Sequence, residues 1–497
     1  MRWRRTLVVL AALSGSGKLT AQEAGYSASA RVLRPLAATQ REDPTAAGTE
    51  IDTRQRDAAE ESVSDVLLEV PGTRPYRTGG LGTFTTASLR GAEVEHTAVL
   101  LGEIPLSTAD ASAFDLSILP LSMAERVVVY RGGAPLWLSQ GVIGGIIQVV
   151  PQSVRGTAFD SSLSAGSFGT YALRSEATLA LGDAGQTRVR TLAGGLGSSG
   201  NFPIAFDNKT SFDVGDDYQV RRKNADFAQA HGLASVSQTL GPGNLELLLL
   251  GFERAGGEPG SPADPVLKAR RQELRGLSGL SYTVERRGGE GRPDLRLSAL
   301  GSFGMSRARF SDLDAEIGTG GGALTENRSL RAFGRVAASV GLTRFLQTSA
   351  LATLTYDGYS PQDALARVPM PDSGRTSLAA GAEAELHAKL LGRRFQLRPS
   401  LRVEHSAANL HSERFGAVVQ TDNQSTLATY RLGAALELLP DLTLSASASS
   451  GARTPSMLEL FGDGALLRGN TALRPEHSRS FGLGLSDVSC VGDFSGS

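Results

Sequence analysis

Hydrophobic and polar residues alternate one by one along much of the chain beyond residue 153. In residues 442–449 leucine and alanine hold the even positions, while threonine and serine hold the odd ones. Residues 395–404 and 171–181 repeat the pattern, with arginine and glutamate among the polar residues. Successive side chains of a β-strand point to opposite faces, so a period of two predicts strands with one apolar and one polar face.

About 14 such strands are predicted between residues 159 and 486. They are separated by turn clusters such as Gly-Asp-Ala-Gly at 182–185 and Gly-Pro-Gly at 241–243. Two chemically different faces repeated in this way are typical of a transmembrane antiparallel β-barrel, apolar towards lipid and polar towards the lumen. A soluble β-sandwich or propeller alternates equally well, and the pattern alone leaves that class open.

A different pattern precedes the alternating region. Residues 62–70, SVSDVLLEV, place valine and leucine at helical spacing and stop at Pro-Gly. Residues 125–150 hold two short β-branched runs joined by a connection with five glycines, Gly132, Gly133, Gly141, Gly144 and Gly145. Glycine tolerates positive φ and close backbone approach, so these strands are expected to turn tightly within a confined volume. The lumen of a barrel supplies such a volume for a small α/β unit.

The N-terminus has the layout of a secretory signal peptide. Three arginines precede the apolar run 7–13, and small polar residues lead to Ala21 and Gln22. The run is too short for the roughly 20 residues of a membrane-spanning helix. Residues 23–61 are polar with little periodicity, which predicts an extended, mobile segment.

The charge and composition of the chain exclude several classes of function. A formal net charge of −1 argues against a nucleic-acid partner. A single cysteine, Cys490, excludes an internal disulfide framework and a cysteine-rich metal site. The six histidines stand singly, and GLGSSG at 195–200 is followed by Asn-Phe-Pro rather than by the helix of a dinucleotide site. We therefore predict no enzymatic activity, no cofactor and no metal site.

Five short motifs follow one another between residues 62 and 151. They are DVLLEVPG at 65–72, LRG at 89–91, VLLGEIPL at 99–106, ERVVVYRG at 125–132 and GVIGGII at 141–147. In this order they resemble the plug domain of the TonB-dependent outer-membrane receptors. RRKNADF at 221–227 and the pieces RTPS, ELFG, GN and LRPE between 453 and 476 resemble parts of the barrel of that family.

The resemblance implies a mainly β fold, a transmembrane antiparallel β-barrel with a small α/β plug domain in its lumen. The predicted parts are a signal peptide (1–22), a mobile periplasmic segment with a TonB box (23–61), the plug (62–152) and the barrel portion (153–497). Plugged barrels of this kind use about 22 strands. About 14 strands therefore predict a C-terminally incomplete barrel and a fragment or truncated reading frame.

The resemblance also implies energy-coupled uptake of a scarce ligand, such as an iron-siderophore or cobalamin, through the outer membrane of a Gram-negative cell. The implied partners are TonB with its inner-membrane energising complex, a small-molecule ligand such as a metal chelate, and outer-membrane lipid. Two alternatives stay open, namely a non-transporting surface adhesin on the same scaffold and a non-functional truncated product.

Candidate site residues follow from these roles. Arginine, tyrosine and serine suit polar or anionic ligands, and the ligand-contact candidates on two plug turns are Arg74, Tyr76, Arg77, Ser107 and Ser112. In the N-terminal segment the TonB-contact candidates are Arg31, Val32 and Leu33. The candidates for ion pairs between plug and barrel are Arg90, Glu125, Arg126 and Arg131, with plug arginines expected to face carboxylates of the barrel wall.

Overall fold

A computed structural model describes residues 43–487, apart from gaps at 47, 55, 57–61, 110–112, 139–141, 183–185, 207–209, 211, 262, 289–292, 318–320, 366–370, 415–416, 440–441 and 463–468. The predicted signal peptide and the TonB-contact candidates Arg31, Val32 and Leu33 lie outside these residues. Among the described residues no helix is long and apolar enough to cross a membrane.

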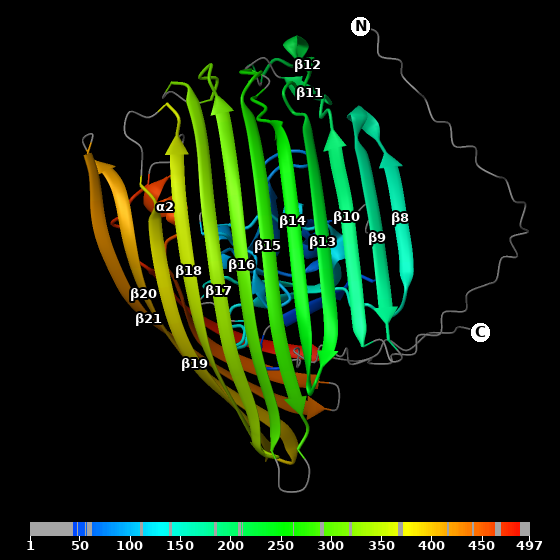
Figure 1. Ribbon diagram of the computed structural model, residues 1–497, viewed down its shortest axis with the longest axis vertical. Helices are drawn as coiled ribbons and strands as arrows, with labels where there is room; N and C mark the ends of the chain where they lie inside the picture. Colours follow the sequence, from blue (N-terminus) through cyan, green and yellow to red (C-terminus); the bar gives the residue numbers. More distant parts are fainter. Residues whose placement is uncertain are drawn as a thin grey trace, which may run out of the picture. The chain divides into compact units, whose positions relative to one another are not determined.

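Fourteen strands form one antiparallel sheet, here called the wall, in which each strand pairs with its neighbour in the chain (Figure 1). The strands are β8 (Ala158–Ala165), β9 (Tyr171–Leu181), β10 (Thr187–Ser198), β13 (Phe227–Leu240), β14 (Gly243–Gly257), β15 (Arg270–Arg286), β16 (Asp294–Asp312), β17 (Ala323–Thr343), β18 (Leu346–Asp363), β19 (Ser373–Leu390), β20 (Arg393–Arg414), β21 (Ala417–Leu439), β22 (Leu442–Arg453) and β23 (Glu476–Asp487). The predicted strand number is confirmed.

The two faces of the wall differ as the alternation predicts. In β18, Leu354 and Tyr356 are about half exposed on the outer face, while Asp357 and Tyr359 are each only 2% exposed on the inner face. Long apolar side chains gather in the same way on the outer face of the other strands. The wall therefore presents an apolar surface outward and a polar one inward.

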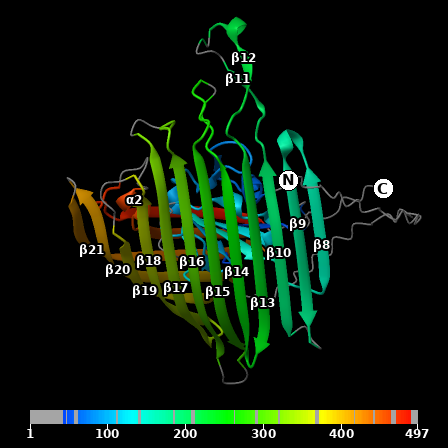
Figure 2. The same cartoon turned by 45° about the horizontal axis from the view of Figure 1, so that its top comes forward.

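The plug lies against the inner face of the wall, where the two ribbon views show its strands behind the wall strands (Figures 1 and 2). Its main sheet has the order β1-β6-β7-β4-β5, and a separate hairpin pairs β2 with β3. The bounds are β1 (Gly48–Asp52), β2 (Thr73–Arg77), β3 (Thr85–Leu89), β4 (Thr97–Leu101), β5 (Ile104–Pro105), β6 (Ala124–Arg131) and β7 (Gly145–Pro151).

Short helices complete the plug and the loops of the wall. The plug holds α1 (Val63–Val66) and the 3-10 helices η1 (Leu67–Glu69), η2 (Val94–His96), η3 (Leu116–Ile118) and η4 (Leu121–Met123). The loops hold η5 (Ser167–Gly169), η6 (Val214–Asp216), the hairpin of β11 (Pro203–Phe206) and β12 (Tyr218–Arg221), and α2 (Met457–Phe461). The helix expected over 62–70 is thus one short α-helix continued by a 3-10 turn. Asp65 closes a capping box with Ser62 at its start.

One strand of the plug precedes its expected beginning at residue 62. β1 pairs antiparallel with β6 in the register Gly48↔Tyr130 to Asp52↔Arg126, within the segment predicted to be mobile. Ile51 is the one apolar residue in GTEID, so the strand has little periodicity of its own. The exposed backbone edge of β6, rather than the sequence of β1, provides the hydrogen bonds that order it.

The glycine-rich connection fits tightly, as its composition predicts. Gly145 has a φ of +149°, and a Cβ at this position would lie 2.2 Å from the carbonyl oxygen of Tyr130. Gly132 has a φ of +98° on the other side of the same connection. Only glycine fits both positions without strain, so β6 and β7 can pair closely.

The hydrophobic core of the plug extends into the wall. Val63, Val127 and Ile147 of the plug belong to one buried cluster with six wall residues. The wall residues are Leu192, Leu233, Leu248, Phe252, Leu300 and Phe333, from β10, β13, β14, β16 and β17. At roughly 1.5–3 kcal/mol for each large buried apolar side chain, these contacts stabilise the plug on the order of 10 kcal/mol before entropy is counted.

Candidate functional site

Two turns of the plug approach the edge of the wall that carries the long loops. One edge of the wall carries short connections of two residues each, at 241–242, 344–345 and 391–392. The opposite edge carries much longer connections, at 199–226, 258–269 and 454–475. The first plug turn, 78–84, joins β2 to β3, and the second, 106–114, follows β5.

The β2 candidates lie just before the first turn. The guanidinium carbon of Arg74 lies 5.6 Å from the ring centroid of Tyr76, and both side chains are exposed. Arg77 instead points back to α1, where it pairs with Asp65 and donates to the Ser64 Oγ at 2.9 Å. Burial alone would raise the pKa of the Asp65 carboxyl, but hydrogen bonds from Ser62 and the charge of Arg77 hold it below its usual value.

Ser107 begins the second turn and is held by the wall. Arg331 of β17 donates from Nη1 to the Ser107 carbonyl oxygen at 2.8 Å and to its Oγ at 2.7 Å. Ser112 lies outside the described residues. Farther along the turn, the carbonyl oxygen of Ala109 accepts from the backbone N–H of Met457 at 3.1 Å, which joins the turn to α2.

Helix α2, in the loop 454–475, packs on the second turn. Ser456 and Glu459 form a capping box at its start. Its side chains Met457 and Leu460 are buried together with Ala109 and Tyr359. The Tyr359 hydroxyl donates to the carbonyl oxygen of Gly462 at 2.8 Å. The loop 454–475 is therefore fastened to both plug and wall.

A chain of charges runs along the wall beneath this loop. Arg331 donates from Nε to Oδ1 of Asp357 at 2.6 Å, and Arg375 donates from Nη2 to Oδ2 of the same carboxylate at 2.9 Å. Arg375 also donates to the carbonyl oxygen of Pro455 at 2.6 Å. Ser107 of the plug is thus connected to the outer loop through two arginines and one buried aspartate.

Arg254 of β14 performs a similar role for the first turn. It donates from Nη1 to the carbonyl oxygen of Gly82 and to the Ser117 Oγ, each at 2.9 Å. Its Nη2 donates to Oδ2 of Asp115 at 2.7 Å. Arg254 and Arg331 therefore set the positions of both plug turns. A cavity of about 30 Å³ lies between the second turn and the wall, lined in part by Ser107, Phe114 and Arg331.

The four plug residues that were predicted to form ion pairs with the barrel wall have different contacts in the structure. Arg126 donates to Glu50 at 2.8 Å, and Arg131 donates to the Thr49 Oγ and the Pro71 carbonyl oxygen, so both hold plug segments together. Glu125 accepts from Ser153 and lies 3.4 Å from Arg155, in the strap that leads to β8. Arg90 has a φ of 55°, with its guanidinium beside Gly132.

Pairs between plug and wall carry the opposite polarity from that expected. Wall arginines face plug carboxylates in Arg254–Asp115, Arg335–Glu103, Arg431–Asp43 and Arg398–Asp43. Within the part of the chain that the structure describes, one pair follows the expected direction, with His96 Nε2 of the plug lying 2.6 Å from Glu476 Oε2 of the wall. The arginines on the polar face of the strands were visible in the sequence, but the plug partner of each was not. The Ser-x-x-Glu signature at 456–459 was a signal for α2 that the sequence analysis left unused.

Comparisons with known proteins decide the family. The family described as "TonB dependent receptor-like, beta-barrel" matches residues 152–496, and "TonB-dependent Receptor Plug Domain" matches residues 42–146. The chain belongs to the TonB-dependent receptors. The plug match begins at residue 42, in agreement with β1 as a strand of the plug.

Solved structures of TonB-dependent receptors share this fold at low identity. The FrpB iron transporter from Neisseria meningitidis matches with a TM-score of 0.70 at 12% identity, over 90% of this chain and 72% of the other. The copper transporter OprC matches with a TM-score of 0.69 at 15% identity, over 89% and 71%. The alcaligin receptor FauA from Bordetella pertussis gives 0.64 at 16%, over 90% and 68%.

Membership places this TonB-dependent receptor in the outer membrane, and the family consists of transporters and receptors rather than enzymes. In bacterial barrels of this kind the short turns face the periplasm and the long loops face outward. The two plug turns and α2 therefore lie on the outer side. Among the described residues no group of three or more histidine, cysteine, aspartate or glutamate side chains is arranged to hold a metal ion.

Proposed function

We propose that this protein is a receptor for the energy-coupled uptake of a scarce ligand, such as an iron-siderophore or another metal chelate, driven by TonB. Family membership supports transport, and the structural neighbours include proteins named as iron and copper transporters and as a siderophore receptor. The ligand meets the receptor at the two plug turns and the outer loops around them.

One observation carries the proposal. The second plug turn is joined to the outer loop twice, by the Ala109–Met457 hydrogen bond and by the chain from Ser107 through Arg331, Asp357 and Arg375 to Pro455. A ligand that displaces α2 alters contacts of the plug at the same time. Ligand binding at the outer loop therefore changes the hydrogen bonds that hold the second plug turn.

The exposed pair Arg74 and Tyr76 and the hydroxyl of Ser107 supply the ligand contacts in this proposal. A guanidinium beside a phenol ring suits an anionic chelate with aromatic or carboxylate groups. Arg77 is less available, because its guanidinium is paired with Asp65. Ser112, outside the described residues, stays a candidate from the sequence alone.

The periplasmic half of the mechanism uses the N-terminal segment. An extended segment can add as a strand to the sheet of a partner, and Arg31, Val32 and Leu33 are the residues proposed to do so with TonB. They precede Asp43, the first described residue, which is bound to Arg398 and Arg431 of the wall. A pull on the segment is therefore transmitted first to Asp43 and then to β1.

The test is accumulation of radioactive iron and copper, offered as a panel of ferric siderophores and copper salts, in cells with and without TonB. We expect accumulation that depends on both this chain and TonB. Arg331→Gln should reduce it severalfold because the second turn loses one of its two links to the outer loop, the one that runs through Asp357 and Arg375. Arg328→Gln is the matched control, since Arg328 lies on the same strand but is exposed and pairs with Glu326 of its own strand. Equal accumulation without TonB would refute the proposal.

A further inference from the structure

The plug is attached to the two halves of the wall by different chemistry. Alternate residues of its central strands form two clusters on opposite faces of the plug sheet. The cluster that contains Val127 and Ile147 continues into the six apolar wall residues of β10, β13, β14, β16 and β17. The cluster that contains Val128 and Ile146 has only plug members among the described residues, including Leu138 from the loop 132–144.

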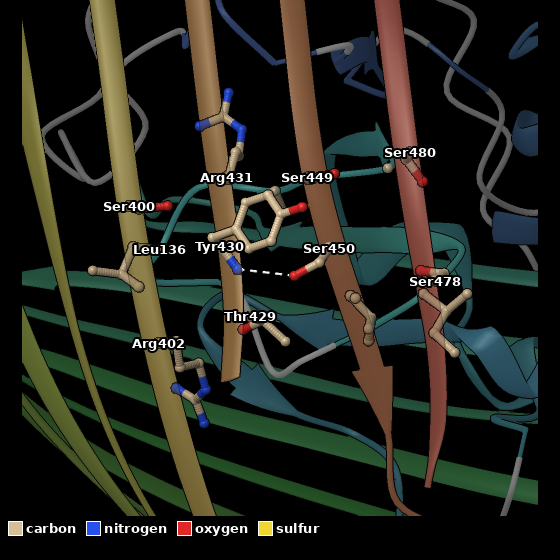
Figure 3. A pocket seen from close by; sticks show the side chains of 16 residues that line it. Leu136, Ser400, Arg402, Thr429, Tyr430, Arg431, Ser449, Ser450, Ser478 and Ser480 are labelled. Atoms are coloured by element: carbon tan, nitrogen blue, oxygen red, sulfur yellow. Dashed lines mark hydrogen bonds between the residues drawn. The ribbon is translucent and has the colours of Figure 1, made fainter. Parts of the chain in front are cut away.

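Beyond that second cluster the wall is polar and made of small side chains. β20 to β23 surround a cavity of about 30 Å³ beside the loop 132–144. Figure 3 shows Arg402, Thr429 and Arg431 together with five serines around it. The serines are Ser400, Ser449, Ser450, Ser478 and Ser480. Four of them share the inner face with the buried Arg431, whereas Ser450 lies on the outer face, where its Oγ accepts from the backbone N–H of Tyr430. A cavity of this size accommodates a water molecule. Its apolar lining residues, Ala134, Leu136, Val142 and Ile143, come from the plug, while the inner face of the wall contributes polar side chains. Separation here therefore breaks less apolar contact than separation from the six apolar wall residues of the other side.

The N-terminal end of the plug is fastened on this same side. Asp43 forms ion pairs with two wall arginines, its Oδ2 lying 2.9 Å from Nη1 of Arg431 in β21 and 3.4 Å from Nη1 of Arg398 in β20. The Thr45 hydroxyl accepts from Arg431 Nη2 at 2.6 Å and donates to Asp43 Oδ1 at 2.6 Å. Any force on the chain ahead of Asp43 therefore acts on the polar side of the plug.

We propose that the plug remains attached to β10, β13, β14, β16 and β17 and separates from β20–β23, so that a hydrophilic ligand passes along the serine-lined inner face of β21–β23. This deepens the proposed function and rests on it for the identity of what passes. The direction of opening follows from the cost of separation, because parting an apolar contact exposes hydrocarbon to water whereas parting a hydrated polar contact exchanges one set of hydrogen bonds for another.

Two matched disulfides lock one side each. A sulfur in place of the Ser449 Oγ would lie 3.0 Å from a Cβ at position 133, and a sulfur in place of the Ile104 Cγ1 would lie 3.2 Å from a Cβ at position 279. Both distances suit a disulfide, in which a sulfur lies about 3 Å from the Cβ across the bond. At the polar site the Ser449 Cβ also lies 3.0 Å from the added Cβ, so the two segments must part by about 0.5 Å to reach the roughly 3.5 Å between the Cβ atoms of a disulfide. The polar lock is Gly133→Cys with Ser449→Cys, the apolar lock is Ile104→Cys with Gly279→Cys, and both carry Cys490→Ser.

The measurement is hydrogen exchange of the full chain in lipid bilayers at increasing, non-denaturing urea. In the unlocked protein we expect amides of 43–53 and 132–138 to exchange at least tenfold faster than those of 104–108 and 116–124 as urea rises. The polar lock should slow exchange of 43–53 at least fivefold, although these residues are not cross-linked themselves. The apolar lock should change it by less than twofold.

Faster exchange of 104–108 and 116–124 in the unlocked protein would overturn the proposal, as would equal effects of the two locks on 43–53. The comparison of exchange rates within the unlocked protein tests the proposal even if neither disulfide forms. The experiment uses neither ligand nor TonB, so it is distinguishable from the test of uptake. A chain that opens on the polar side but accumulates no metal would contradict the transport function and leave the opening direction intact.

Discussion

Arg254 of the wall and Asp115 of the plug form an ion pair whose nitrogen and oxygen lie 2.7 Å apart, and the Asp115 side chain is fully buried. The second carboxylate oxygen of Asp115 accepts from the backbone N–H groups of Thr85 and Ser117 at 3.0 and 2.9 Å. One carboxylate thus joins the hairpin β2–β3, the helix η3 and the wall. The position of the plug is defined by a few such residues in addition to the apolar contact.

Asp115→Ala should destabilise the plug strongly. The substitution leaves Arg254 without its plug carboxylate and two buried amides without an acceptor, and loss of one partner of a buried pair costs about 3–5 kcal/mol. Urea unfolding followed by the fluorescence of Trp137, in the plug loop 132–144, measures the change. Asp314→Ala is the control, because Asp314 forms an exposed pair with Lys268, which is worth about 0–1 kcal/mol. Similar losses in both variants would show that Arg254 and Asp115 do not hold the plug.

Gly145→Ala should prevent the close pairing of β6 and β7. A methyl group at this position would lie 2.2 Å from the Tyr130 carbonyl oxygen, in a backbone conformation that alanine disfavours. The expected loss is on the order of 3 kcal/mol or more, measured as increased cleavage of the plug by protease. Gly156→Ala is the control, since nothing lies within 4 Å of an added Cβ there. A protease-resistant Gly145→Ala plug would contradict the tight fit.

The attachment of helix α2 to Arg453 of the wall should weaken as the pH falls. Burial alone would raise the pKa of the Glu459 carboxyl, but hydrogen bonds from Arg453 and Ser456 lower it from 4.5 to about 2. A lowered pKa contributes stability that is complete above the unfolded value and is lost as pH falls from about 4.5 through about 2. The protection of the amides of residues 457–461, measured as their exchange rate relative to the intrinsic rate at the same pH, should therefore fall over this window. In Glu459→Gln the protection should be lower at neutral pH and nearly flat across the window, and an unchanged pH profile in that variant would exclude Glu459 as the cause.

A charge on the outer face of the wall should destabilise the barrel according to its depth. Leu354 lies in the middle of β18 and is 54% exposed, while Leu342 lies near the end of β17 and is 55% exposed. Arginine costs about 2–4 kcal/mol at the middle of the bilayer and about 0–1 near its surface. Folding into lipid vesicles, followed by the shift of the heated and unheated bands on a gel, should show a loss for Leu354→Arg and little for Leu342→Arg. Equal effects would place the two residues at the same depth.

The candidate site was predictable in its general position but not in its partners. The plug turns were identified because their motifs resemble those of a family, and Ser107 does contact the wall. The residues that hold the turns, Arg254 and Arg331, looked like any other arginines on the polar face of a strand. Asp115 and Arg254 are 139 residues apart in the chain, and no local pattern links such positions.

The strands, the two faces of the wall and the glycines between β6 and β7 could be predicted from the sequence alone, because side-chain period and backbone freedom are local properties that neighbouring residues encode. The packing of the plug on the wall settled three further features: β1 belongs to the plug, wall arginines face plug carboxylates, and the apolar core of the plug continues into the β10–β17 half of the wall. These features depend on which surfaces meet when the plug packs against the inner face. The alternation specifies that this face is polar on average, and the fold selects where leucine or serine meets the plug.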